Sequence, residues 1–566
     1  MADCLKLINE ANNGRLDDDT LIAIIEELQK VKRQRKIPSA LKTVEEDIFE
    51  KGSFLIKEAE LAKKIERRNR YKNILVEKKI LDLAEKADAL VEDPSLALEA
   101  LLVGVNAPFE GAQRSVDSLI NSLGGEFLGG MTADLKAKNL EVKFNKMDES
   151  FEREVSRALG NLNTKNPKTN AEIGVTSKDA KDIAEIMFKY QRMALKRENE
   201  AGAYIRLKEG RVVRTSHDPG RMTAVGKDKW VEYMMEKDRI EWSKTARGDF
   251  EIPEKASAET IEKIRNDQKA FLERSYEAIT TGVRIASDRT EIGAAFTGPK
   301  NVAKARSESA VFTFKNPDKW YDYNKDFGRG SLRESFIQDL QSSIRSTALM
   351  EQLGTNPEAM FERVQKKLLE KHRSDPKKVK DLKREGSIVN FSSMLAEVTG
   401  DINVGSHTTL ARWMHGYRAL QTMAKLGGAA VSAFSDVAFM ASNRMYQGRS
   451  LMDAWGDSFS AVFKGMSGKE MRDFSDRLGV GFQSQLGDFM SRFNASDDIP
   501  GKTSKYLNTF FKLNLLQPWT EANKRGITMM ISNDLAREAG KRFDSLPPDM
   551  QRLLGLYEID GKKWEA

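Results

Sequence analysis

The feature that most constrains the fold is a long apolar pattern at helical spacing. After the break at Ile37-Pro38-Ser39, apolar residues recur at this spacing as far as about Val91. The pattern predicts one long helix or a helical hairpin bent near Gly52. Only 14 prolines occur among 566 residues, 31% of which are charged, and this composition favours long helices over many-turned sheets. We therefore predict an all-α fold of elongated, multi-domain helical bundles.

Two changes of composition predict how the chain is divided. A polar, Asn-rich stretch at 160–176 and a basic stretch around Pro376 are candidate boundaries. Residues 203–214 alternate in polarity around a turn at Glu209-Gly210, so we expect at most a small β-hairpin there. The predicted domains are an N-terminal helical domain with the long basic helix (1–160), a middle helical domain (177–375) and an apolar, Met-rich helical domain (388–566).

Charge and cysteine content exclude several kinds of chemistry. The 92 Lys and Arg exceed the 85 Asp and Glu by only 7, which over this length does not by itself indicate nucleic-acid binding. The single cysteine, Cys4, cannot form an intrachain disulfide, and no Cys and His cluster has metal-ligand spacing. This cysteine content indicates synthesis in a reducing compartment, and because the first residues lack the pattern of a signal peptide we expect no secretion by that route. We predict no cofactor and no metal.

No catalytic motif is complete in the sequence. Gly501-Lys502-Thr503 lacks the first glycine of a phosphate-binding loop and a preceding strand. Glu149-Ser150 and Glu334-Ser335 match the first two residues of a transglycosylase site, but neither is followed by the segment that completes it. The histidines available as catalytic bases lie outside any nucleophile or zinc motif: His217, His372, His407 and His415. We therefore predict that the chain is not an enzyme.

The strongest charge run lies at 63–79, where eight bases and only Glu66 and Glu77 give a local net charge of +6. A helix with this charge can follow a phosphate backbone without reading bases. The alternative is the solvated outer face of a long helix. A second basic run at 366–384 contains Pro376 and is better interpreted as a mobile connector. The candidate DNA-backbone contacts are Lys63, Lys64, Arg67, Arg68, Arg70 and Lys72.

The most unusual apolar stretch runs from Leu426 to Ser442. It is slightly short for a helix that spans a membrane. Gly428 and Ser432 lie four residues apart, a spacing that would let another helix approach closely. Asp436 is costly at the centre of a bilayer, so we favour a buried core helix over a membrane span. The candidate helix-packing or channel residues are Gly428, Ser432 and Asp436.

Several short phrases, spread over about residues 100–440, carry a resemblance to one family of proteins. They are Leu101-Leu102-Val103-Gly104 with Arg114-Ser115-Val116-Asp117, Val213-Arg214-Thr215-Ser216-His217-Asp218 with Lys227-Asp228-Lys229-Trp230, Phe314-Lys315-Asn316 with Leu353-Gly354-Thr355-Asn356-Pro357, and Lys425-Leu426-Gly427-Gly428. In these phrases the chain resembles the large internal virion proteins of tailed bacteriophages. These are ejection or DNA-transfer proteins that are stored in the capsid and expelled before the genome.

The resemblance implies a mostly helical homo-oligomer that helps form a conduit for DNA across the host cell envelope. The implied partners are other internal virion proteins, portal and tail proteins, phage DNA bound without sequence preference, and the host envelope. The implied location is the capsid interior and, after ejection, the host envelope, following synthesis in the host cytoplasm. Such proteins are frequently longer, so we expect this chain to be the front part of a longer product.

Two other functions stay open at this point. One is a phage-associated enzyme, either a peptidoglycan hydrolase or a nucleic-acid enzyme, whose acidic residues are distant in sequence. The other is an intracellular DNA-binding scaffold, which depends on the basic run at 63–79 and on the same lack of catalytic motifs.

Overall fold

Helices make up most of the described chain in a computed structural model, and no strand occurs among the described residues. One antiparallel bridge, between Ile240 and Phe314, is found there. The prediction of an all-α fold is therefore confirmed. The structure describes residues 44–206, 209–214, 217–236, 238–245, 250–253, 256–281, 301–307, 312–328, 330–384, 390–400, 442, 445 and 516–565.

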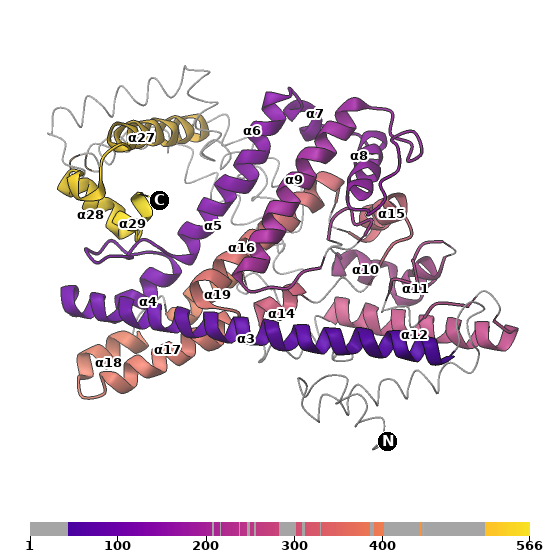
Figure 1. The fold of residues 1–566 in the computed structure, drawn as a ribbon, viewed down its shortest axis with the longest axis horizontal. Helices are drawn as coiled ribbons and strands as arrows, with labels where there is room; N and C mark the ends of the chain where they lie inside the picture. The colour runs from indigo at the N-terminus through magenta and orange to yellow at the C-terminus, as the bar shows by residue number, and fades with distance from the viewer. Residues whose placement is uncertain are drawn as a thin grey trace.

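The longest helix, α3, follows one edge of the described part of the molecule (Figure 1). It is one continuous helix of 48 residues, so of the two alternatives the single long helix is right. The helices, with one π-helical turn (η1) and one 3-10 turn (η5), are α3 (Val44–Val91), α4 (Ser95–Leu102), α5 (Val116–Gly124), η1 (Gly125–Gly129), α6 (Gly130–Ala137), α7 (Glu141–Asn145), α8 (Glu149–Leu162), α9 (Lys178–Ala201), α10 (Pro219–Val225), α11 (Lys227–Met235), α12 (Ala258–Thr281), α14 (Val302–Ser307), α15 (Pro317–Phe327), α16 (Leu332–Leu353), α17 (Pro357–Lys371), α18 (Pro376–Lys383), α19 (Phe391–Thr399), α27 (Leu516–Glu538), η5 (Phe543–Ser545), α28 (Pro548–Leu556) and α29 (Gly561–Trp564).

Short polar side chains fix where many of these helices begin. Ser177 accepts a hydrogen bond from the backbone N–H of Ala180 at the start of α9, and Ser331 does the same for Glu334 at the start of α16. Such caps satisfy backbone N–H groups that have no partner within the helix. In four other helices an Asp or Asn cap is followed directly by proline, which suits the first helical position: α10, α15, α17 and α18.

The largest core cluster lies between α8, α9, α16 and the continuous α5–η1–α6 rod. Leu159 of α8, Met187 of α9 and Phe336 of α16 are almost fully buried in it. The polar stretch at 160–176 connects α8 to α9, so helices on both sides of this candidate boundary share one core. The division into domains itself stays a prediction.

A small cluster packs Ala62 and Ile65 of α3 against the ends of α9 and α16, and two larger clusters complete the core of the described residues. One joins the second half of α3 to α4, α17, α18 and α19, and Leu98, Leu102 and Val364 are fully buried in it. The other is aromatic and packs α10, α11, α12 and α15 around Trp230 and Tyr323. Apolar burial of this kind is the dominant favourable contribution to folding.

The hairpin expected at 203–214 is absent from the described residues of that segment. Helix side chains instead bind its backbone groups. The N–H of Ile205 donates to Asn199 Oδ1 at 2.7 Å, and the N–H of Tyr204 donates to Ser307 Oγ at 2.7 Å. Backbone groups that are paired in this way need no partner strand. Alternation of polarity was therefore misleading here.

The second basic run is also different from what we expected. Residues 366–384 contribute the end of α17 and all of α18, so the run is largely helical rather than a connector. No described helix is long and apolar enough to cross a bilayer. The apolar stretch at 426–441, with Gly428, Ser432 and Asp436, lies outside the described residues.

Candidate nucleic-acid interface

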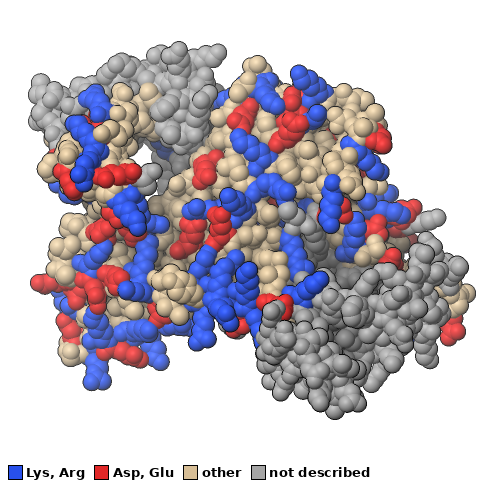
Figure 2. All heavy atoms as spheres, viewed as in Figure 1, with Lys and Arg blue, Asp and Glu red and all other residues tan. Residues whose placement is uncertain are grey.

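The basic run at 63–79 occupies the middle of α3, and this part of the helix has two unlike sides. Ala62, Ile65, Asn69 and Ile80 are buried against the rest of the molecule. The opposite side faces solvent, and Lys and Arg side chains gather there in the space-filling view (Figure 2). The helical repeat of 3.6 residues therefore divides the run between structural and surface positions.

Arg68 and Asn69 bind the carboxyl end of α9. The Arg68 guanidinium donates to the carbonyl oxygens of Gly202 and Ala203, both at 3.0 Å, and Asn69 Nδ2 donates to the Gly202 carbonyl at 2.9 Å. A cation is favourable at a helix C-terminus, where unpaired carbonyls concentrate negative charge. Burial lowers the pKa of Arg68. Arg68 therefore holds α3 in place, and it is not free to contact DNA in this arrangement.

The next turn of α3 makes the same type of contact with the end of α16. Asn73 Nδ2 donates to Thr355 Oγ1 at 3.0 Å, and Asn73 Oδ1 accepts from the Thr355 N–H at 3.0 Å. Gly354 precedes Thr355 with a φ of +74°, and a Cβ there would lie 2.5 Å from Asn73 Oδ1. The close approach of α3 to α16 therefore requires glycine at this position. Together these contacts fix which side of α3 faces solvent.

Two other candidate contacts lie at the margin of the exposed side. Lys63 and Lys72 are half-buried. Burial lowers the pKa of Lys72, and the nearby positive charge of Arg68 lowers it further, whereas Glu351 and Glu200 oppose this shift. The structure therefore places these two lysines beside the solvent-facing surface rather than at its centre.

Four cations define the exposed surface, and we call them the basic row: Lys64, Arg67, Arg70 and Lys78. All four are exposed, and none forms an ion pair with a residue that the structure describes. At 1.5 Å per residue the row extends over about 21 Å, the length of about six phosphates along one DNA strand. Lys78 was part of the predicted run, but it was not among the candidate contacts.

Apolar side chains interrupt the basic row, a feature that the sequence analysis did not single out. Tyr71, Ile74 and Leu75 are 64%, 57% and 48% exposed. In the sequence they fit the apolar pattern of α3, and only the contacts of Asn69 and Asn73 show that their side of the helix is the outer one. Exposed apolar groups of this size on one face are common at interaction surfaces.

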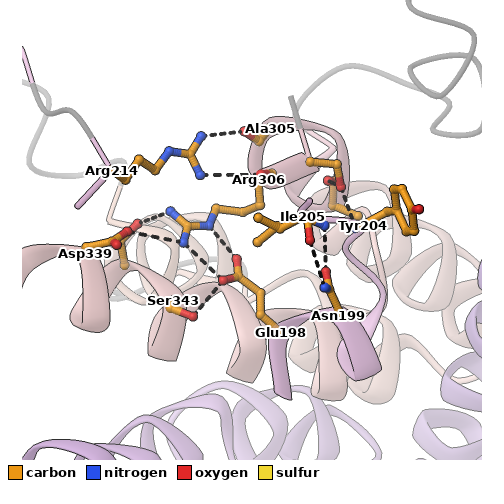
Figure 3. Close-up of polar contacts among 12 residues, drawn as sticks. Glu198, Asn199, Tyr204, Ile205, Arg214, Ala305, Arg306, Asp339 and Ser343 are labelled. Carbon is orange, nitrogen blue, oxygen red and sulfur yellow. Dashed lines mark hydrogen bonds and ion pairs between the residues drawn. The ribbon is translucent and has the colours of Figure 1, made fainter. Parts of the chain in front are cut away.

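A buried polar network holds together the elements behind this interface (Figure 3). Glu198, at the end of α9, is 1% exposed and forms an ion pair with Arg306 of α14, whose second terminal nitrogen lies 3.1 Å from Glu198 Oε2. Ser343 of α16 donates to the same carboxylate at 2.6 Å. Asp339 of α16 pairs with Arg211 at 2.9 Å. The network therefore joins α9, α14, α16 and the segment that precedes α10.

Arg214 also belongs to this network, but it binds backbone carbonyls rather than a carboxylate. Its guanidinium donates to the carbonyl oxygens of Ala305 at 3.1 Å and Arg306 at 3.4 Å. Burial lowers the pKa of Arg214 to about 10, and the charge of Arg306 contributes to this shift, so the side chain is still protonated at neutral pH. The network thus contains more arginines than carboxylates, and backbone carbonyls offset the difference.

Among the residues considered for catalysis, those that the structure describes have structural partners, whereas His407 and His415 lie outside the described residues. Glu149 lies 2.6 Å from Lys325 Nζ and 3.0 Å from Arg153 Nη2, and the hydrogen bond from Lys325 lowers its pKa, which is the wrong direction for a general acid. Glu334 lies in the first turn of α16, where its backbone N–H donates to Ser331 Oγ. His217 Nδ1 lies 2.7 Å from the Tyr323 hydroxyl. Among the residues searched, no group of acids, His and Cys could hold a metal ion.

Comparisons with known proteins add no further assignment. No protein-family model matches the chain, and neither a curated protein nor a solved structure matches it.

Proposed function

We propose that this chain is a structural internal virion protein of a tailed phage. It is stored in the capsid as a homo-oligomer, leaves with the genome, and helps form the conduit for DNA across the host envelope. Within this function the basic row contacts the DNA backbone. The observation that carries the proposal is the row itself, four exposed cations on one side of a rigidly held helix. The resemblance to ejection proteins supplies the biological setting.

Nonspecific backbone binding is the kind of contact that this surface supports best. Lys and Arg attract phosphates through charge and release bound counterions, and this process needs no base readout. The row is straight because α3 is one helix. The contacts of Arg68 with the carboxyl end of α9 and of Asn73 with the carboxyl end of α16 hold this helix against the core. The row can therefore follow a phosphate backbone without rearrangement of the described core.

Duplex binding by the full chain tests the contact. If four phosphates are neutralised, the association constant should fall about 150-fold between 50 and 200 mM salt. The row variant carries Lys64→Gln, Arg67→Gln, Arg70→Gln and Lys78→Gln, and we expect it to lose most of this salt dependence and to bind weakly at 50 mM. Fluorescence anisotropy with a random-sequence duplex measures both effects.

A control with the same charge change comes from the second basic run. It carries Lys366→Gln, Arg373→Gln, Lys377→Gln and Lys380→Gln, all at exposed positions. We expect the control to bind nearly as well as wild type. Equal losses in the two variants would mean that binding follows net charge alone, and the assignment to the row would be wrong.

The place of the protein in the particle needs a separate test. Gel analysis of purified full and emptied particles should show several copies of the chain in full particles and none in emptied ones. Its absence from full particles, or its retention after the genome has left, would contradict the proposed function even if the row binds DNA.

A further inference from the structure

The described C-terminal segment meets the rest of the described molecule at an acidic side chain. Glu558 Oε2 lies 2.8 Å from Arg114 Nη1 and 3.1 Å from Lys79 Nζ. Two backbone hydrogen bonds accompany this contact, from Gly111 N–H to the Gly555 carbonyl at 3.2 Å and from Gln113 N–H to the Leu556 carbonyl at 3.3 Å. Figure 1 shows α28 and α29 beside the connection between α4 and α5.

Lys79 and Arg114 form an anion site that the chain fills with its own carboxylate. Both cations reach the same oxygen of Glu558, although they come from α3 and from the residues just before α5. Burial lowers the pKa of Lys79, and the charge of Arg114 lowers it further, whereas Glu558 opposes the shift. Two cations held this close together favour an anion between them, since their mutual repulsion is otherwise uncompensated.

The backbone on both sides of the contact has conformations that few side chains allow. Gly111 has a φ of +87°, and a Cβ there would lie 2.9 Å from Leu83 Cδ1 and 3.0 Å from Glu558 Oε1. Glu558 itself has a φ of +58°, in the left-handed region that residues other than glycine rarely adopt. Glycine at 111 thus makes room for the carboxylate, and the backbone of Glu558 is strained while it is bound.

The anion site continues the surface of the basic row. Lys79 directly follows Lys78, the last cation of the row, and lies seven residues after Lys72 on the same flank of α3. A polyanion that follows the row toward the carboxyl end of α3 would therefore reach Lys79 and Arg114, provided that Glu558 has left them.

We propose that Lys79 and Arg114 bind the phosphodiester backbone of a nucleic acid, and that Glu558 occupies their site until residues 546–565 move away. The inference rests on the proposed function and deepens it, because it assigns regulation to the same surface. With Glu558 bound, the row offers four cations. After its release, the surface offers six.

The test compares duplex binding by the full-length wild type and Glu558→Gln. The substitution keeps the size of the side chain and removes the charge that competes with phosphate. Two additional phosphate contacts should steepen the dependence of log K on log salt by about 1.8. The loss of affinity between 50 and 200 mM salt should therefore be about twelvefold larger than in wild type. Adding Lys79→Met and Arg114→Gln to Glu558→Gln should return the slope to the wild-type value.

The matched control is Asp549→Asn, which removes one negative charge from the same segment at an exposed pair with Arg552. We expect its slope to equal that of wild type. An unchanged slope in Glu558→Gln would overturn the inference, whereas the proposed function would still stand if the row variant loses binding. A steeper slope in both Glu558→Gln and Asp549→Asn would show a general charge effect and would also overturn it. The inference would also be overturned if Glu558→Gln bound vesicles with phosphatidylglycerol more tightly than wild type did but did not bind DNA more tightly.

Discussion

The two basic runs of this chain have the same net charge but arrange it differently on the molecule. Residues 63–79 carry eight bases against two acids, and residues 366–384 carry nine bases against three, so each run has a net charge of +6. The first leaves four cations exposed without an ion pair to a described residue. The second packs against α3 and α4 and pairs several of its cations there. The second run also leaves four cations exposed, but they are divided between α17, α18 and the turn that joins them: Lys366, Arg373, Lys377 and Lys380. Equal charge in a sequence thus does not give the same arrangement of charge at a surface.

The acids that neutralise the second run come from α3 and α4. Lys371 lies 2.7 Å from Glu85, and further ion pairs join Lys378 to Asp88 and Arg384 to Glu99. The basic run occupies the middle of α3, while the carboxyl-terminal turns of the same helix supply Glu85 and Asp88 to α17 and α18. Because opposite charges on packed helices attract, four cations of the second run pair with acids of α3 and α4.

The largest loss of unfolding free energy should follow when a buried cation loses its carboxylate partner. Replacing Glu198 with Gln leaves Arg306 buried without its carboxylate, and breaking such a pair costs about 3–5 kcal/mol of unfolding free energy. The neighbouring Glu200→Gln removes an exposed i,i+4 partner of Lys196, and we expect its effect to stay within about 0.5 kcal/mol. Urea unfolding followed by circular dichroism measures both. A small loss in Glu198→Gln would show that the network in Figure 3 contributes little to stability.

Two adjacent arginines of the first run should differ in the same assay. Arg68→Ala removes two hydrogen bonds to the end of α9, and because the side chain is half-exposed we expect a loss of about 1–2 kcal/mol. Arg67→Ala removes a member of the basic row and should change stability by less than about 0.5 kcal/mol. Arg67→Ala should also remove one phosphate contact, so the dependence of log K on log salt in DNA binding should be less steep than in wild type. Equal stabilities for the two variants would contradict the division of α3 into a structural and an exposed side.

The smallest change in unfolding free energy should come from breaking an exposed ion pair of the second run. The hydrogen bond from Lys371, together with its charge, lowers the pKa of Glu85. A lowered pKa in the folded state means that the pair stabilises at neutral pH and that this contribution is lost as the pH falls through the folded pKa of Glu85. Glu85→Gln should therefore be slightly less stable than wild type at pH 7, and the difference should disappear once the pH is below the folded pKa of Glu85. A difference that persists in acid would assign the effect to packing rather than to charge.

The sequence predicted the elements better than their contacts. The apolar spacing identified α3, whereas α18 begins at Pro376 within the run that we expected to be a connector. The run at 203–214 shows where local reasoning failed. Its alternation suggested a hairpin, but Asn199 and Ser307, which come from two different helices, satisfy its backbone groups. A sequence pattern does not show which distant side chain will bind a backbone N–H.

The candidate interface shows the same limit. Of the six predicted contacts, the structure exposes Lys64, Arg67 and Arg70, leaves Lys63 and Lys72 half-buried, and places Arg68 on the carboxyl end of α9. Lys78 belongs to the exposed row, and Lys79 binds Glu558, which lies 479 positions further along the chain. Helical periodicity orders these residues around α3, but it does not say which side is covered.

The sequence by itself determined the helical class, the apolar spacing along α3 and the concentration of charge within it, because these depend on local spacing and composition. Only the tertiary structure decided which cations are available to a partner. That choice depends on the ends of α9 and α16, on the acids that α3 presents to α17 and α18, and on the carboxylate of Glu558. These groups are brought together by apolar clusters that join helices distant in the sequence, so the spacing within the basic run does not record the outcome.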